Sequence, residues 1–311
     1  MKRRQLYVIL GILALGLLVY APRLVRDSGQ EPPAPVVISL EPLGGETPAR
    51  IRVTGAAEGD TVRLEASTAG WVANGHPADS FKVADLLAAL DTLAVRELVA
   101  RNPRNHERLG VTEASGHRVE LSGAGGGKVV FLLGNRDDAT HGYHVRLPGA
   151  PEVYLLPGPA GAALRRTLDE WRDHAIARLD TARVREIVVR REGEKLVLSR
   201  GEDGWSLDGA SADSAKVRSL LDRLAHLDAM GFPTDSAAAA ADFDAPDGAL
   251  EAFVQEEGDV TGRALALSLR LVRGEEESSP WLVRRADGEV FRLSSYTIGG
   301  LLPTREELTG G

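Results

Sequence analysis

The hydrophobic and polar positions of the chain follow one pattern that occurs twice. Each copy opens with apolar residues alternating with polar ones, as at Val62 and Leu64, which is typical of a half-buried strand. A Gly-Trp pair, an Ala-Asp-Ser triplet and a run with apolar residues at helical spacing follow in the same order. The copies keep a constant offset of 134 residues, which relates Trp71 to Trp205 and Leu90 to Leu224. Such a constant offset predicts an internal duplication.

The Ala-Asp-Ser triplets predict where the helix of each copy begins. Asp79 and Asp213 stand just before the apolar periodic residues, where an N-cap carboxylate accepts hydrogen bonds from first-turn amides. We expect the helices to carry apolar faces that extend to Leu93 and Leu227, and to pack on the preceding strands. The predicted fold class is therefore α+β, with two tandem repeats of antiparallel sheet plus amphipathic helix behind a single N-terminal membrane helix.

Further strand patterns follow each predicted helix. In the first copy we expect them to form a second sheet, with strands at 117–121, 129–133, 143–147 and 153–156. The second copy has corresponding patterns at 250–254, 264–272, 281–283 and 290–293. Residues 158–179 are predicted as a helix that joins the copies, residues 237–241 as a loop or short helix, and residues 296–302 as a closing helix. We place repeat 1 at 50–180, repeat 2 at 181–303 and a polar tail at 304–311.

The start of the chain predicts a membrane anchor over residues 1–26. Basic residues 2–4 precede an uncharged, almost wholly apolar run from Leu6 to Ala21. We favour an uncleaved single-pass helix, inserted through residues 6–22, over a signal peptide, because Pro22 would follow the cleavage site. The basic start favours a cytoplasmic N-terminus. The bulk of the chain is then extracytoplasmic, on an inner (cytoplasmic) membrane anchor, and the Pro- and Gly-rich residues 27–49 are expected to form a stiff tether.

The composition of the chain argues against nucleic acid as a partner and excludes chemistry that depends on cysteine. The 311 residues carry a formal net charge of −8 and include no cysteine. An acidic chain is a poor match for nucleic acid, because neutralising phosphates requires a basic face. The absence of cysteine excludes disulfides, thiolate nucleophiles and cysteine-based zinc sites.

Several residues are candidates for chemistry, and each has a structural interpretation that we favour. Asp79 and Asp213 are better explained as helix caps than as a pair of catalytic carboxylates. Trp71 and Trp205 are expected to be core anchors rather than ligand platforms. The glycines at 123, 125, 126 and 127 lie between two predicted strands, whereas a phosphate-cradling loop leads from a strand into a helix.

The histidines give no metal site that we assign. His141 and His144 have a spacing that suits a metal on a helix, but their neighbours predict a loop entering a strand. His106 and His117 are isolated, and Arg172-Asp173-His174 is interpreted as a polar helix end. The nucleophile elbow and the Walker, Rossmann and HExxH signatures are absent from the sequence. We therefore assign no catalytic, cofactor-binding or metal-binding residues.

The repeated pattern resembles a known family. Two units of the form strand, Gly-Trp, Ala-Asp-Ser-x-Lys-Val and a leucine-rich helix, after a basic start and one membrane segment, are similar to the domain-of-unknown-function family 4340. The join from Leu168 to Asp173 and the strand at 184–189 fit the same pattern, so the resemblance covers about residues 50–303. It departs where Leu109-Gly110-Val111 becomes Phe243-Asp244-Ala245. The resemblance implies a membrane-anchored auxiliary component of gliding-motility-type ABC transport systems, with no catalytic residues to carry over.

The leading hypothesis is a non-catalytic extracytoplasmic accessory or scaffold protein of an ABC-2-like transport system. Its partners would be the permease or ATPase subunits, or another envelope protein. Two alternatives remain open. An envelope hydrolase would use Asp79, Asp213 or the region of His141 and His144, and requires a carboxylate of raised pKa in a polar cleft. A module that binds cell-wall polymer or peptide requires exposed aromatic residues on one sheet face.

Overall fold

The computed structural model describes residues 38, 40–43, 47–55, 57, 60–91, 95, 97–255, 262–274 and 280–309. The predicted anchor over residues 1–26 lies outside the described residues, and so does most of the predicted tether. The described part of the tether includes the 3-10 helix η1 (Glu41–Leu43), and Ile38 and Leu43 are buried there. Among the helices that the structure describes, none is both long enough and apolar enough to cross a membrane.

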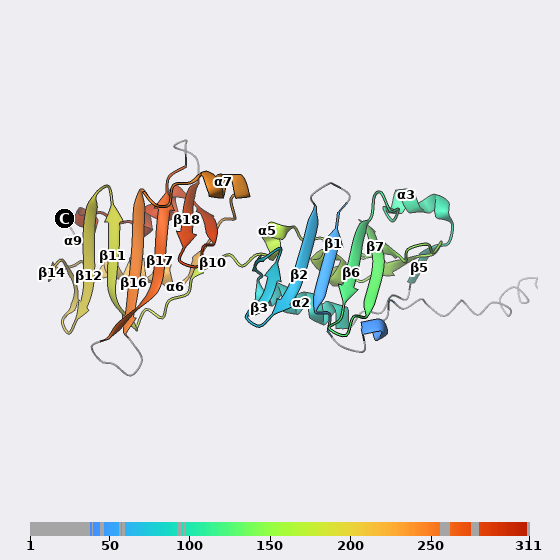
Figure 1. Cartoon of the computed structure of the whole chain (residues 1–311), viewed down its shortest axis with the longest axis horizontal. Helices are drawn as coiled ribbons and strands as arrows, with labels where there is room; N and C mark the ends of the chain where they lie inside the picture. The colour runs from blue at the N-terminus through green and yellow to red at the C-terminus, as the bar shows by residue number, and fades with distance from the viewer. Residues whose placement is uncertain are drawn as a thin grey trace, which may run out of the picture. The chain divides into compact units, whose positions relative to one another are not determined.

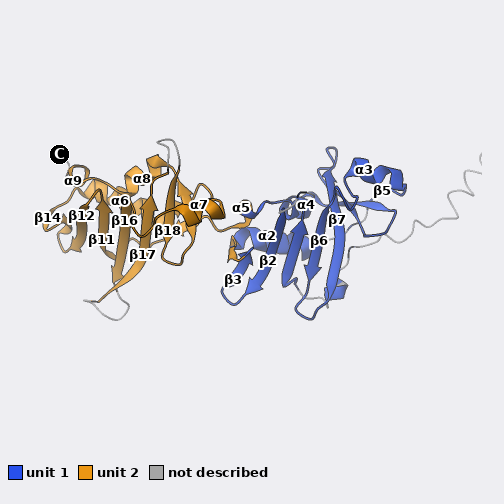
Figure 2. Cartoon of the chain, turned by 45° about the horizontal axis from the view of Figure 1, so that its top comes forward, with its two compact units in different colours: residues 1–74, 80–168 blue, residues 75–79, 169–311 orange. Residues whose placement is uncertain are grey.

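The chain divides into two compact units, which Figure 2 shows in different colours. Unit 1 comprises residues 1–74 and 80–168, and unit 2 comprises residues 75–79 and 169–311. Each unit has its own large antiparallel sheet, so the two copies of the sequence pattern do not share one sheet. The fold class is α+β, as predicted.

Unit 1 is built on one sheet, not on two as we expected from the sequence. Its strands lie in the order β3-β2-β1-β6-β7-β8-β9-β5. The prediction of a second sheet was wrong because β1 pairs with β2 on one side and with β6 on the other, so the later strands extend the first sheet. The strands are β1 (Arg50–Thr54), β2 (Thr61–Ser67), β3 (Gly70–Ala73), β5 (Glu97–Ala100), β6 (His117–Ser122), β7 (Lys128–Arg136), β8 (Tyr143–Arg146) and β9 (Val153–Leu156).

The helices of unit 1 follow the apolar periodicity of the sequence. They are α2 (Ser80–Asp91), η2 (Pro103–Asn105), α3 (His106–Leu109) and α4 (Gly158–Leu164). In α2 the buried residues are Val83, Leu86 and Leu90, at the spacing of one helix face. On the sheet, Ile51 lies between its cross-strand partners Leu64 and Leu121, and all three are buried. Figure 1 shows α2 behind this sheet, where the helix covers one of its two faces.

Unit 2 contains a sheet of order β14-β13-β12-β11-β16-β17-β18-β19, and its order from β13 to β19 follows that from β3 to β9 in unit 1. Its strands are β11 (Val184–Arg191), β12 (Glu194–Gly201), β13 (Gly204–Leu207), β14 (Ala210–Ser211), β16 (Gly248–Gln255), β17 (Arg263–Val272), β18 (Trp281–Arg285) and β19 (Val290–Leu293). Its helices are α6 (Ser214–Ala225), α7 (Asp235–Ala240), α8 (Ser295–Leu301) and α9 (Arg305–Thr309). Residues 75–79 of this unit include the two-residue strand β4 (His76–Pro77).

The core of unit 2 lies between its sheet and α6. The buried face of α6 consists of Val217, Leu220, Leu221 and Leu224, which pack in one cluster with the inward residues of β12, β16 and β17. The inward residues alternate with outward polar ones along β17, where Leu267, Leu269 and Leu271 are buried. This alternation leaves one face of the sheet uncovered by α6, and that outward face is turned toward the viewer in Figure 1.

Two helix predictions were wrong in their extent. Residues 158–179 form α4, the short helix α5 (Leu168–Trp171) and the strand β10 (Ala175–Ala177), not one helix. The break comes at Arg165, where the backbone closes with hydrogen bonds from Arg165 to Ala162 and from Arg166 to Ala163. Residue Leu227, predicted in the helix of the second copy, lies in the strand β15 (Leu227–Asp228), which pairs with β10. In both places strand pairing between distant residues replaced the last helical turns.

Candidate functional site

Asp213 is a helix cap, as predicted. Its carboxylate accepts hydrogen bonds from the backbone amides of Ala215 at 2.8 Å and Lys216 at 3.1 Å, at the start of α6. These amides have no partner within the helix, so the carboxylate satisfies donors at the positive end of the helix dipole. A hydrolase that used Asp213 would need a carboxylate free to meet a substrate, and this one is engaged by its own helix. The related residue Asp79 donates its backbone amide to the carbonyl of Trp171 at 2.9 Å.

The tryptophans of the repeated pattern are less buried than we expected. Trp71 and Trp205 are half-buried, and Trp205 packs against the core of unit 2 from its margin. The prediction that both are core anchors was therefore only partly correct. Trp171 and Trp281 are the buried ones, with 1% and 8% of their surface exposed. The burial of Trp281 weighs against the sheet of unit 2 using that ring as an exposed platform for polymer or peptide.

His141 and His144 do not converge on one point. The carboxylate of Asp137 organises the loop before β8 by accepting hydrogen bonds from the amides of Ala139 and Thr140 and from the Thr140 hydroxyl. The hydrogen bond from the Thr140 amide, followed by that from the Thr140 hydroxyl, lowers the pKa of Asp137. His141 is exposed on this loop, with φ of 59°. His144 is buried on β8, and its Nε2 lies 3.8 Å from Oδ2 of Asp137. Over the residues that the structure describes, no group of three side chains of the kinds that bind metals lies together.

Burial sets the protonation of two histidines in unit 1. Desolvation lowers the pKa of His144, although the charge of Asp137 opposes the shift. Burial also lowers the pKa of His117, and the positive charge of Arg165 adds to that effect. Both shifts favour the neutral imidazole in the folded chain.

The glycine-rich segment at 123–127 is a hairpin between β6 and β7, as predicted. The amide of Gly123 donates to the carbonyl of Gly127 at 3.0 Å, and the strands pair antiparallel on both sides of the turn. The segment leads into a strand, so it does not present a helix N-terminus to a phosphate.

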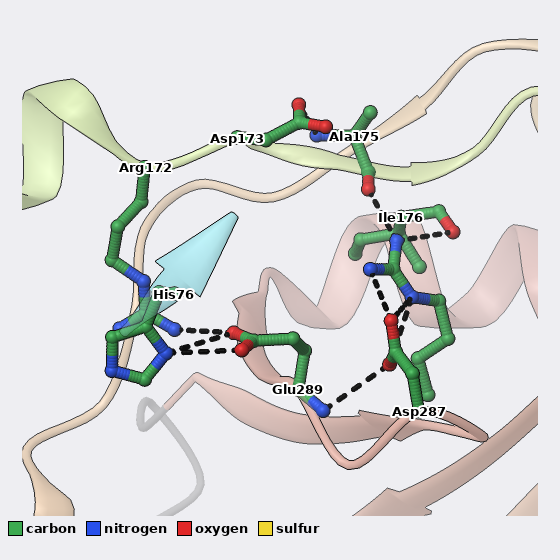
Figure 3. A network of polar contacts seen from close by, with 8 residues as sticks. His76, Arg172, Asp173, Ala175, Ile176, Asp287 and Glu289 are labelled. Atoms are coloured by element: carbon green, nitrogen blue, oxygen red, sulfur yellow. Dashed lines mark hydrogen bonds and ion pairs between the residues drawn. The ribbon is translucent and has the colours of Figure 1, made fainter. Parts of the chain in front are cut away.

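A cluster of polar side chains in unit 2 is centred on Glu289 (Figure 3). The guanidinium of Arg172 donates to Glu289 at 2.6 Å, and Nδ1 of His76 lies 3.0 and 3.2 Å from the two oxygens of the same carboxylate. The side chains of Arg172 and Glu289 are only 10% and 16% exposed. The Arg172 guanidinium also lies over the ring of Phe232, with its central carbon 3.6 Å from the ring centroid. We call Glu289, Arg172 and His76 the Glu289 cluster.

A second ion pair adjoins this cluster in the turn before β19. Arg285 donates through Nε and Nη2 to Asp287 and through Nη1 to the carbonyl of Ala175 at 2.7 Å. Burial by itself would raise the pKa of Asp287, but hydrogen bonds from Arg285 and from the amide of Glu289 lower it overall. The turn is thus held by charge-assisted bonds.

The geometry of the Glu289 cluster describes a carboxylate held by two basic groups. Both oxygens of Glu289 contact basic side chains, so this carboxylate holds Arg172 and His76 in position. A general base would instead need an oxygen that can reach a substrate proton. Sequence reasoning missed these residues, because His76 and Glu289 are 213 positions apart. One signal was present in the repeated sequence pattern, because its second occurrence has Ala210 where the first has His76. Side chains that differ between copies are candidates for contacts made by one copy alone.

Comparison with known proteins identifies the family of the chain. No curated protein matches the chain, and no solved structure matches it either. Residues 71–246, which are more than half of the chain, match the family described as "Domain of unknown function (DUF4340)". The matched segment begins at Trp71 in β3 and includes α2, α6 and the strands between them. The chain belongs to the DUF4340 family.

Proposed function

We propose that this protein is a membrane-anchored, extracytoplasmic accessory or scaffold of an ABC-2-like transport system, and that it acts by binding and not by catalysis. The basic residues 2–4 and the apolar run from Leu6 to Ala21 support the anchor. Membership of the family supports the auxiliary role, because the family pattern implies a component of gliding-motility-type ABC systems. Its partners would be the permease or ATPase subunits.

The observation that carries this proposal is the open face of the sheet in unit 2. Helix α6 and the core cover one face, while the outward residues of β16, β17 and β18 lie on the other. Leu265, on β17, is an apolar side chain with 53% of its surface exposed. Its cross-strand partner Phe253 is half-buried on the same face. A rigid sheet with an open face of mixed polar and apolar side chains suits the binding of another protein.

We further propose that the two units are tandem repeats behind one membrane helix. The equal strand order of the two sheets supports this, as does the placement of an amphipathic helix after β4 and after β14. The closing elements support it too, since α4 and α5 follow β9 as α8 and α9 follow β19. A duplicated binding unit gives a transport complex two related surfaces for assembly.

Site-specific photocrosslinking in intact membranes tests the scaffold role. A photoreactive amino acid replaces Leu265 on the open face of β17, and a matched variant carries it at the exposed Ser219 on α6. Mass spectrometry then identifies what each variant captures. We expect the variant at 265 to capture ABC permease or ATPase subunits and the variant at 219 to capture much less of them.

Other outcomes of this experiment count against the proposal. Capture of cell-wall polymer or of soluble exported proteins alone would favour the polymer- or peptide-binding alternative. Recovery of the whole chain in the soluble fraction after cell disruption would remove the membrane anchor from the proposal. A reporter enzyme fused after residue 311, active only outside the cytoplasm, tests the predicted orientation separately.

A further inference from the structure

A row of basic residues crosses the open face of the sheet in unit 2. Cross-strand pairing places Lys195 of β12 opposite Arg190 of β11, and Arg190 opposite Ala249 of β16. Ala249 in turn lies opposite Arg270 of β17, which lies opposite Arg284 of β18. We call these five positions the basic row; four of them are cations and none is acidic. Neighbouring strands are about 4.8 Å apart, so the charges are closely spaced.

The pairing of Arg270 with Arg284 is unfavourable for the sheet alone. Residues directly opposite on antiparallel strands have Cβ atoms about 4.5–5.5 Å apart, and like charges there destabilise the pair. Both side chains are partly exposed, at 49% for Arg270 and 35% for Arg284. Local choices that conflict with stability are concentrated at functional sites in natural proteins. The Arg270–Arg284 pair is therefore a candidate for binding an anion.

The surface beside these two arginines is hollowed. A cavity of about 400 Å³ is lined by Ser268, Arg270, Arg284, Arg285, Ala286 and Gly288, and no carboxylate is among these residues. The guanidinium of Arg285 is already engaged by Asp287 and by the carbonyls of Ala175 and Ile176. Arg270 and Arg284 are the other two cations of this lining, and both are partly exposed.

Both arginines are oriented by the segment before β16. Arg270 donates to the carbonyl of Phe243 at 3.0 Å, and the guanidinium of Arg284 lies 4.6 Å from the centroid of the buried Phe243 ring. The same segment brings Asp244 to the pair, with Oδ1 3.2 Å from Arg270 and 3.5 Å from Arg284. The Asp244 side chain is 92% exposed, so this carboxylate is held weakly and solvent can replace it.

We propose that Arg270 and Arg284 form a binding site for a phosphoryl group, and that Asp244 is an internal carboxylate which the ligand displaces. One oxygen of Asp244 is shared between the two guanidinium groups: it accepts a hydrogen bond from Arg270 at 3.2 Å and lies 3.5 Å from Arg284. A phosphoryl group has more acceptor oxygens and up to twice the charge, so it can accept hydrogen bonds from both forks at once. Lys195 of the basic row adds to the positive potential around the site, whereas Arg190 is paired with Glu251 at 2.8 Å. This inference goes beyond the proposed scaffold role and does not depend on it.

Isothermal titration calorimetry on the purified full chain tests the site, with inorganic phosphate as the probe at fixed ionic strength. We expect saturable binding that Arg270→Gln and Arg284→Gln each weaken by about tenfold or more, because each loses charge-assisted hydrogen bonds. Asp244→Asn is expected to tighten binding several-fold by removing the competing carboxylate. The control Arg218→Gln removes an exposed charge from α6 and should change the affinity by less than twofold.

The source of the phosphoryl group is distinguished by two further probes. Tighter binding of glycerol 3-phosphate, a monoester, indicates a soluble phosphate compound. Tighter binding of glycerophosphoglycerol, the diester headgroup of an anionic phospholipid, indicates a lipid. The proposal is overturned if phosphate does not bind, if the two arginine variants behave like Arg218→Gln, or if Asp244→Asn weakens binding. Preference for the dicarboxylate succinate over phosphate would also overturn the assignment to a phosphoryl group.

Discussion

Substituting Glu289 and substituting Arg172 should each destabilise unit 2, but by different amounts. Glu289→Gln leaves the guanidinium of Arg172, whose side chain is 10% exposed, opposite a neutral amide. Arg172→Met leaves Glu289 with Nδ1 of His76 still 3.0 Å away, so the carboxylate keeps a partner. The methionine also keeps an apolar contact with the ring of Phe232, over which the guanidinium now lies. We therefore expect Glu289→Gln to cost more free energy of unfolding than Arg172→Met.

The magnitudes follow from burial and from the remaining partners. Removing one member of a buried ion pair costs about 3–5 kcal/mol, because the other charge stays buried and unpaired. The cluster retains some exposure, so we expect about 3 kcal/mol for Glu289→Gln and about 2 kcal/mol for Arg172→Met, nearer to a single charge-assisted hydrogen bond. The double variant replaces both charges together. It should lose about 3 kcal/mol, which gives a coupling of about 2 kcal/mol between the two residues.

Urea unfolding followed by tryptophan fluorescence measures these changes. Three of the four tryptophans, Trp171, Trp205 and Trp281, lie in unit 2, so a Trp71→Phe background restricts the signal to that unit. With a slope of about 1–3 kcal/mol per molar urea, a loss of 3 kcal/mol lowers the midpoint by about 1–3 M. Additivity of the two single variants within about 0.5 kcal/mol would refute the reasoning, because uncoupled residues do not share an ion pair.

Three further predictions concern the cap, one turn and one buried histidine. Asp213→Ala should lower the free energy of unfolding of unit 2 by about 1 kcal/mol, because α6 loses its cap. The control Asp222→Ala, at an exposed site within α6, should not lower it, and urea unfolding measures both variants. Gly110→Ala should cost more than 1 kcal/mol, because Gly110 has φ of 68° and an added Cβ would lie 2.7 Å from the side-chain oxygen of Asn135. Its control is Gly125→Ala, where an added Cβ meets nothing within 4 Å; equal thermal midpoints for the two variants would contradict the argument. Burial lowers the pKa of His144, so the unfolded state binds the proton more readily than the folded one. Stability should therefore fall as pH drops below about 6.5, the unfolded pKa, and level off below the folded pKa. The free energy of unfolding of unit 1, measured between pH 5 and 8, should show this decrease. If a His144→Gln variant kept the full pH dependence, His144 would not be its source.

The sequence by itself determined the local elements of the chain. Alternation predicted most strands of both sheets but not β5 or β14, and helical spacing identified the buried faces of α2 and α6, because these periods reflect which side chains leave water. The position of Asp213 before an apolar run identified it as a cap, since that role depends on amides two and three residues away. The glycine-rich hairpin at 123–127 was also recognised from its flanking strands alone.

Pairing between distant segments was decided by the tertiary structure. β1 accepts β6 as a second neighbour, which joined the expected second sheet to the first, and pairing of β10 with β15 ended helices that periodicity had extended. The Glu289 cluster and the cavity lined by Arg270 and Arg284 likewise depend on segments that meet only in the folded chain. The physical reason is that a charged side chain can form an ion pair with many oppositely charged groups. In the same way, an edge strand can pair with many other strands. Which partner it meets is set by packing of the whole unit, and a local pattern of residues does not contain that choice.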